Sequence, residues 1–377
     1  ISLLRILARP MIERSVPVDV ALYLRRAEQF VAGSRSMPKN FGASIKLLLA
    51  FLLLYRGLGR LGIKQLDEHA DGEIRKLAKN DHRSKLLKRA WCSVRAEIAR
   101  SRGLSMKAVE WFLDSTTPAL ERDSLTQDWR RWSLARSLRE SGQDALANKV
   151  LNQIYQHVSQ GGASFRAARS YVLLELGHFH LENGAFERAH QCYLESFEAA
   201  NTESCAREAL YVEVYSASAR ITESTSRHDE PRLLEILDLA ERREDLRLSL
   251  ITAFVLGDLQ LRTNQFDNAQ RYFTMAGQHA ELLGDKLAMA CVHEKQAYLA
   301  GLVDRREEAL RESVHGAALD VESKHHRVAA KQLKYASLLA AELGRAEEAK
   351  EFAIQAERQQ EDADLQDIGL GRHVQQR

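Results

Sequence analysis

The sequence predicts an all-α protein built from a repeated helical hairpin. Alanine recurs at a spacing close to forty residues, and each such alanine lies twelve residues after another small residue. The alanines are Ala108, Ala147, Ala189, Ala269, Ala309 and Ala349, and the preceding small residues are Ala96, Ala135, Gly177, Gly257, Ala297 and Ser337. The composition agrees, because only five of the 377 residues are proline and 28% are charged.

Each repeat contains a turn signal between its small residue and its alanine. Seven residues after the small residue stands a residue type that readily adopts the left-handed conformation in which helices end. These are Gly103, Gly142, Gly184, Asn264, Asp304 and Gly344. The unit is therefore predicted to be a helix, a tight turn and a second helix.

A bulky residue follows four positions after the alanine in most copies, as in Phe112, Leu151, Tyr193 and Phe273. An offset of four keeps both residues on one helical face, where they pack against the small residue of the first helix. The long interval between Ala189 and Ala269 contains a degenerate copy with Ser218 at the small position. We therefore expect about seven hairpins.

This pattern resembles the tetratricopeptide repeat, and the clearest copy runs through Leu173, Leu176, Gly177, His180, Ala189, Tyr193 and Ser196. The resemblance implies a right-handed superhelical solenoid of antiparallel helix pairs, with the first helix of each pair lining a concave groove. The repeat of about forty residues is longer than the common unit of the family. In this it is similar to kinesin light chains and to the sensor arms of bacterial regulators.

Three parts are expected along the chain. Residues 1–80 have a helical pattern out of phase with the repeats and are predicted to form a divergent helical cap. Residues 81–360 are the repeat array, with an irregular turn between Ser224 and Pro231 in the fourth hairpin. Residues 361–377 are predicted to form a polar C-terminal tail that frays at its end.

Charge is distributed unevenly. Residues 1–150 hold 28 Lys and Arg against 16 Asp and Glu, a net +12, and the remainder holds 26 against 36, a net −10. The stretch from Arg75 to Arg102 is strongly basic. It is interpreted either as a solvated face balanced by acidic neighbours or as a docking surface for an acidic partner or a phosphate-bearing ligand. Nucleic-acid binding is not expected, because no aromatic platform or groove-reading motif accompanies the basic residues.

The sequence predicts a cytoplasmic protein with no membrane span. The longest apolar run, Leu47 to Leu54, is far below the roughly 20 residues that cross a bilayer. The four cysteines show no paired spacing, which is typical of a reducing compartment. The first residue is Ile1 and not Met, which we interpret as the start of a fragment.

No catalytic residue, cofactor or metal is expected. Nucleophile, phosphate-loop and zinc-protease motifs are missing from the sequence. His178, His180, His190 and Cys192 fall in one repeat, but the first two point in different directions on a helix and cannot share an ion directly.

The predicted functional surface is the groove, and its residues follow from the family positions that contact ligands. They are Trp129, Trp132, Arg136, Arg139, Tyr171, His178, Tyr215, Phe254, Asp258, Arg262, Tyr298, Lys331 and Lys334. Aromatic and Arg side chains dominate binding interfaces. The alternative for Trp132 and Phe254 is that they pack between repeats. The Asn used by chaperone-binding members to grip a carboxylate has no counterpart here.

The sequence suggests three possible functions. The first is a scaffold that binds a partner protein, as a peptide or helix, in the concave groove. The second is the ligand- or peptide-sensing arm of a signalling or transcription regulator whose effector domain is not in the fragment. The third is a structural subunit of a large multiprotein complex.

Overall fold

The computed structural model describes residues 82–115, 124–159, 166–200, 206–224 and 227–375. The cap expected over residues 1–80 and the first part of the basic stretch from Arg75 lie outside the described residues. Within the described ranges the chain forms α-helices and one short 3₁₀ helix, and no strand is present in them. The predicted all-α class is confirmed.

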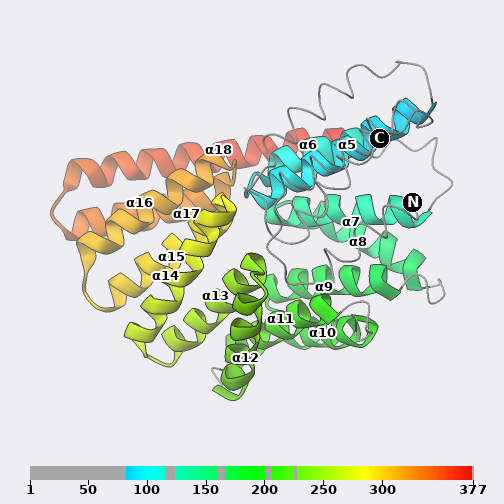
Figure 1. Cartoon of the computed structure of the whole chain (residues 1–377). Helices are drawn as coiled ribbons and strands as arrows, with labels where there is room; N and C mark the ends of the chain where they lie inside the picture. Colours follow the sequence, from blue (N-terminus) through cyan, green and yellow to red (C-terminus); the bar gives the residue numbers. More distant parts are fainter. Residues whose placement is uncertain (1–81, 116–123, 160–165, 201–205, 225–226, 376–377) are drawn as a thin grey trace, which may run out of the picture.

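The helices pair into seven consecutive hairpins, shown in Figure 1. In chain order they are α5 (His82–Ser101) with α6 (Ser105–Ser115), α7 (Ser124–Glu140) with α8 (Asp144–Ser159), α9 (Arg166–Glu182) with α10 (Phe186–Ala200), α11 (Ala206–Ser224) with α12 (Glu230–Arg242), α13 (Leu246–Arg262) with α14 (Phe266–Leu283), α15 (Lys286–Leu302) with α16 (Arg306–Glu322), and α17 (His326–Glu342) with α18 (Ala346–Gln375).

The turn residues have the predicted conformation. All six have a positive φ, between 58° at Asn264 and 79° at Gly142. The irregular turn of the fourth hairpin holds the 3₁₀ helix η3 (Arg227–Asp229). Glu244, with φ 54°, lies in the turn between the fourth and fifth hairpins, as Gly284 and Lys324 do in the two turns between hairpins that follow.

The small residues are required by close contact with the bulky residue of the second helix. A Cβ atom on Gly177 would lie 2.5 Å from the Tyr193 ring, and one on Gly257 would lie 2.6 Å from the Phe273 ring. Both rings are fully buried. The repeated alanines are also buried, so the spacing seen in the sequence marks the contact surface inside each hairpin.

The array curves back so that its first hairpin contacts the turn between the fifth and sixth (Figure 1). The Lys286 amide at the start of α15 donates a 3.0 Å hydrogen bond to the Arg102 carbonyl just after α5. The first amides and the last carbonyls of a helix have no partner within it. This hydrogen bond therefore pairs a free amide at the start of α15 with a free carbonyl after the end of α5. We call this the closing contact.

Gly103 brings the two turns of the closing contact together. A Cβ atom there would lie 2.1 Å from the Leu287 amide nitrogen. Only a residue without a side chain fits at this distance, so the backbone of the first turn rests directly on the start of α15.

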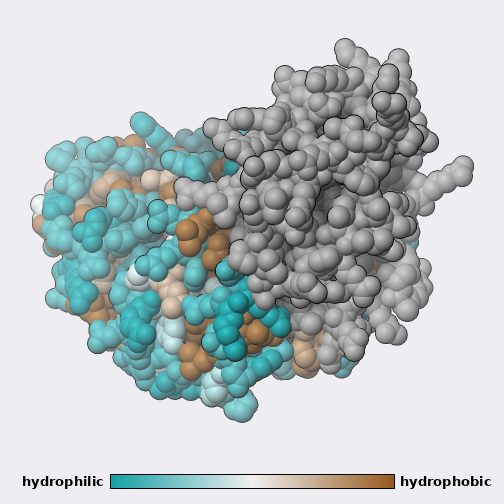
Figure 2. Space-filling model, viewed as in Figure 1, coloured by the Kyte–Doolittle hydropathy of each residue, from teal (hydrophilic) through white to brown (hydrophobic). Residues whose placement is uncertain are grey.

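The C-terminal residues continue the last helix. α18 runs without a break past residue 361, where the sequence predicts the beginning of a polar tail, and reaches Gln375. Ala363, on this continuation, is 4% exposed. On the coloured part of the surface, hydrophilic residues predominate and hydrophobic residues form separate patches (Figure 2).

Candidate functional site

The concave surface contains a cavity of about 690 Å³, which we call the central pocket. The first helix of every hairpin contributes to its wall, through Arg100, Arg136, His178, Tyr215, Phe254, Cys291 and Lys331 in chain order. Ala363 and Gln366 of α18 complete the lining. The curvature of the array thus gathers side chains that lie more than 200 residues apart in the sequence.

A network of arginines and carboxylates forms one wall of the central pocket. Arg139 pairs with Glu175 at 3.1 Å, and Arg136 pairs with Glu140 at 3.0 Å. Arg100 reaches the same Glu140 from the first hairpin, at 3.2 Å. These ion pairs link three successive first helices, and the Glu175 side chain is only 1% exposed.

The network fixes the charge of its members. Burial by itself would raise the pKa of Glu140, but Arg100, Arg136 and Arg139 hold it at about 2. The same pairing keeps the arginines charged despite their burial. Since each guanidinium already faces a carboxylate, this wall is held in one arrangement before any ligand arrives.

His178 occupies the next position along the pocket and is neutral. Burial, together with Arg139 and Arg136 nearby, lowers its pKa well below the usual value for histidine. Its Nδ1 atom lies 2.9 Å from the Tyr193 hydroxyl, and its ring meets that of Tyr215 edge-on at 4.1 Å. The histidine therefore connects the packing core of the third hairpin to the pocket surface.

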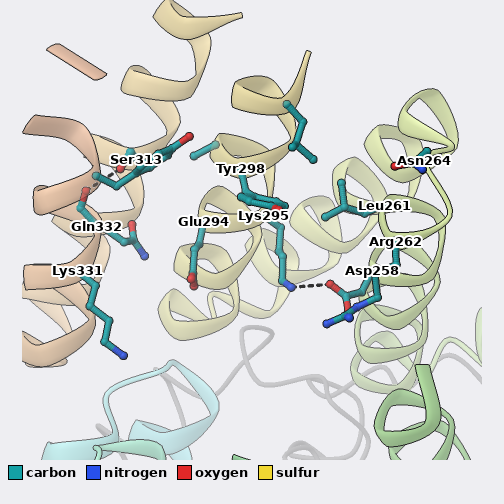
Figure 3. Close-up of a pocket in the computed structure, with 13 residues that line it drawn as sticks. Asp258, Leu261, Arg262, Asn264, Glu294, Lys295, Tyr298, Ser313, Lys331 and Gln332 are labelled. Carbon is teal, nitrogen blue, oxygen red and sulfur yellow. Dashed lines mark hydrogen bonds and ion pairs between the residues drawn. The ribbon is translucent and has the colours of Figure 1, made fainter. Parts of the chain in front are cut away.

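A second cavity of about 640 Å³ lies over the fifth to seventh hairpins, and we call it the C-terminal pocket (Figure 3). Asp258 forms one side, where it accepts hydrogen bonds from Lys295 and from Arg262. Burial by itself would raise the pKa of Asp258, but these two cations lower it. Tyr298 and Leu302 on α15 are about half exposed, at 54% and 49%.

Lys331 on α17 lines both pockets, so the two adjoin on the concave surface. Its side chain is exposed, and among the described residues it makes no hydrogen bond or ion pair. Tyr335, one turn further along α17, lines the C-terminal pocket. The shared wall thus carries a cation that forms no ion pair with the described residues, next to apolar and aromatic surface. The Glu294 carboxylate lines the same pocket, and the charge of Lys331 opposes the rise in the pKa of Glu294 that burial causes.

Most of the groove residues predicted from the sequence line one of the two pockets. The central pocket contains Arg136, Arg139, His178, Tyr215, Phe254 and Lys331, and the C-terminal pocket contains Asp258, Arg262, Tyr298 and again Lys331.

Three of the remaining predicted residues, Trp132, Tyr171 and Lys334, do not line either pocket in the described structure. Trp132 is 5% exposed, and its Nε1–H donates a 3.0 Å hydrogen bond to the Tyr171 carbonyl. Its ring packs on that of Tyr171, so both belong to the contact between the second and third hairpins. Lys334 is exposed on α17 outside both pockets. Trp129 belongs to α7, but its side chain lies outside the described residues.

Sequence reasoning missed several lining residues. Arg100 and Arg247 enter the central pocket from the last turn of α5 and the first turn of α13, and Arg247 pairs with Asp285 at 2.6 Å. Arg100 holds the same repeat position as the predicted Arg139, but no groove residue was predicted in the first hairpin. Arg247 precedes the family contact positions of its helix. Lys295 lines the C-terminal pocket and was missed because it does not occupy a family contact position.

No protein-family model and no curated protein matches the sequence. Solved structures do match. A Rap protein complexed with competence and sporulation factor aligns with a TM-score of 0.68 at 12% identity, covering 92% of this chain and 99% of that one. The Rap conjugation gene regulator of the plasmid pLS20, in complex with the Phr* peptide, aligns with a TM-score of 0.55 at 14% identity, over 92% and 96% of the two chains.

Aspartyl phosphate phosphatase F from Bacillus subtilis aligns with a TM-score of 0.51 at 12% identity, over 91% of this chain and 92% of that one. At such identities the likeness concerns the fold. The chain has the all-α, superhelical fold of tetratricopeptide-repeat solenoids. Within that class its architecture is similar to that of the Rap proteins.

Two further findings concern the environment of the protein. No helix in the described ranges is both long and apolar enough to cross a membrane. Cys192 and Cys291 are free thiols, and burial raises the pKa of Cys192 to about 11. This thiol is therefore protonated and unreactive at neutral pH.

Proposed function

We propose that this protein is a binding scaffold that holds an extended peptide, or a short segment of a partner protein, along its concave surface. The observation that carries the proposal is Lys331, an exposed cation without an ion-pair partner among the described residues, on the wall shared by two adjoining pockets. An elongated ligand crossing this wall would occupy both pockets at once.

The chemistry of the surface favours a ligand with an acidic group and an apolar side chain. The arginines of the central pocket are already paired with carboxylates, so they present a fixed polar surface and few unused charges. Lys331 is available for a carboxylate. Tyr298 and Leu302 offer half-exposed apolar area beside it, which an aliphatic or aromatic side chain would cover.

The solved structures that are similar to this chain support the same conclusion. Two of them are named as complexes, one with competence and sporulation factor and the other with the Phr* peptide. The fold is shared over more than nine-tenths of this chain. We infer that the concave surface serves peptide binding here too, with side chains particular to this chain selecting the ligand.

The test begins with peptide selection on the full chain. A displayed library of random short peptides, selected on the immobilised protein, should yield sequences enriched in Asp or Glu next to a large apolar residue. Binding of a recovered peptide is then measured by fluorescence anisotropy with wild-type protein and with the Lys331→Ala variant. We expect a loss of about 1–2 kcal/mol in binding free energy, roughly 5- to 30-fold in affinity.

Lys334→Ala is the matched control, because it removes the same charge from the same helix three residues away, outside both pockets. Its affinity should equal that of the wild-type protein. Equal losses of affinity in the two lysine variants would mean that overall charge, and not the place of Lys331, determines binding, which would overturn the proposal. A library that yields no enriched peptide would also overturn it.

A role as the sensing arm of a regulator is the second candidate, and the observation that favours it is the likeness to a conjugation gene regulator. In this candidate the peptide binds to the same site and thereby regulates a partner. We retain binding without catalysis as a prediction, although one neighbour is named a phosphatase. A structural subunit of a complex and a cytoplasmic location also remain predictions. Incubation with small phosphorylated substrates, with release of phosphate as the readout, tests the absence of catalysis.

A further inference from the structure

Three ligand-bearing side chains meet on the sixth hairpin, apart from both pockets. His293 comes from α15, and Glu312 and His315 come from α16. Their ligand atoms all lie within 4.8 Å of one another, and within the described residues no other group of His, Cys, Asp and Glu side chains has this geometry. None of the three lines the central or the C-terminal pocket.

The arrangement of the three side chains is set by the helices. Glu312 and His315 are three residues apart, which places them on the same face of α16. His293 faces them from the neighbouring helix, and its Nδ1 atom lies 2.7 Å from Glu312 Oε2. Arg311 contacts the other carboxylate oxygen, Oε1, at 3.5 Å, which leaves Oε2 directed at the histidines.

We propose that His293, Glu312 and His315 form a binding site for a divalent transition-metal ion of the zinc class. Two imidazoles and one carboxylate are a ligand set that zinc takes with water in the remaining position. Tetrahedral bonds of 2.0–2.2 Å place ligand atoms about 3.3 Å apart. Rotation of the exposed His315 side chain brings its ligand atom to that spacing, and the His293 and Glu312 side chains must move apart from their present 2.7 Å. The helices α15 and α16 can keep their places in both adjustments.

The ion would replace the hydrogen bond between His293 and Glu312. Imidazole and carboxylate favour Zn²⁺, Co²⁺ and Ni²⁺ over Mg²⁺ and Ca²⁺, which prefer oxygen ligands alone. Since the ligands come from both helices of one hairpin, a bound ion would link α15 to α16. The site does not depend on the proposed peptide surface.

The test is isothermal titration of ZnCl₂ into the full chain without a histidine tag. We expect one ion per chain. His293→Ala and His315→Ala should each lower the affinity about tenfold or more, and Glu312→Gln, which keeps the side-chain shape, should do the same. His190→Ala is the matched control, since His190 lies on α10 and is not a member of the cluster. It should bind as the wild type does.

Two readouts separate this site from other causes of metal binding. Circular dichroism of each variant shows whether the helices are retained. The visible spectrum of the Co²⁺-loaded chain should show no thiolate-to-metal absorption, because no cysteine belongs to the cluster. Unchanged affinity in the three cluster variants, an equal loss in His190→Ala, a thiolate band, or no binding of Zn²⁺ would each overturn the proposal. Peptide binding is measured without metal, so failure of one proposal leaves the other intact.

Discussion

Substituting Gly103 tests whether the array closes on itself. Gly103 and Gly142 end the first helices of the first two hairpins, with φ of 71° and 79°. An alanine in either place costs about 1 kcal/mol because of the left-handed conformation. A Cβ on Gly142 meets nothing within 4 Å, but one on Gly103 would lie 2.1 Å from the Leu287 amide nitrogen and 2.8 Å from its Cβ.

The two turns of the closing contact must therefore separate in Gly103→Ala. Overpacking of this kind costs a further 1–3 kcal/mol or so. We expect Gly103→Ala to lose about 2–4 kcal/mol of unfolding free energy and Gly142→Ala about 1 kcal/mol.

Urea unfolding followed by circular dichroism measures the difference, and small-angle X-ray scattering should show a larger radius of gyration for Gly103→Ala alone. If the two variants lost equal stability and kept equal dimensions, the closing contact would have no role in solution.

Three further predictions concern packing and charge. The pKa of Glu140 is about 2, against 4.5 for an ordinary glutamate, so its contribution to stability is complete above pH 4.5 and is lost as the pH falls toward 2. Between pH 4.5 and 2 the unfolding free energy of Glu140→Gln should therefore fall less than that of the wild type, by up to about 3 kcal/mol. Trp132→Phe removes the hydrogen bond to the Tyr171 carbonyl and should cost about 1–2 kcal/mol in urea unfolding. Gly257→Ala should destabilise the wild type but become neutral or stabilising beside Phe273→Leu, measured by thermal unfolding, because the Phe273 ring blocks the added methyl group.

The hairpins could be predicted from the sequence because each one is a local structure. Gly177, Ala189 and Tyr193 lie within seventeen residues, and the packing that requires them acts inside a single hairpin. The spacing therefore records both helices and the turn. The closing contact left no such signal, because it joins Gly103 to Leu287 and depends on the curvature accumulated over four hairpins.

The lining of the two pockets was predictable in part for the same reason. Arg136, His178 and Tyr298 were found because a residue's position within its repeat determines whether it faces inward. Trp132 has an inward position by the same rule, yet its indole turns to the Tyr171 carbonyl and is buried between hairpins. The cluster of His293, Glu312 and His315 was missed because its partners lie on two helices, and only packing brings them within 4.8 Å.

The closing contact constrains how this protein can change in length. An open solenoid gains or loses a repeat at little cost, since each unit touches only its neighbours. Here the carbonyl of Arg102 must meet the amide of Lys286, so the hairpins between them must sum to a fixed rotation and rise. Duplication or deletion of one unit in this interval would carry the two turns past each other. The number of repeats between them is thus set by geometry, much as strand number is set in a closed barrel.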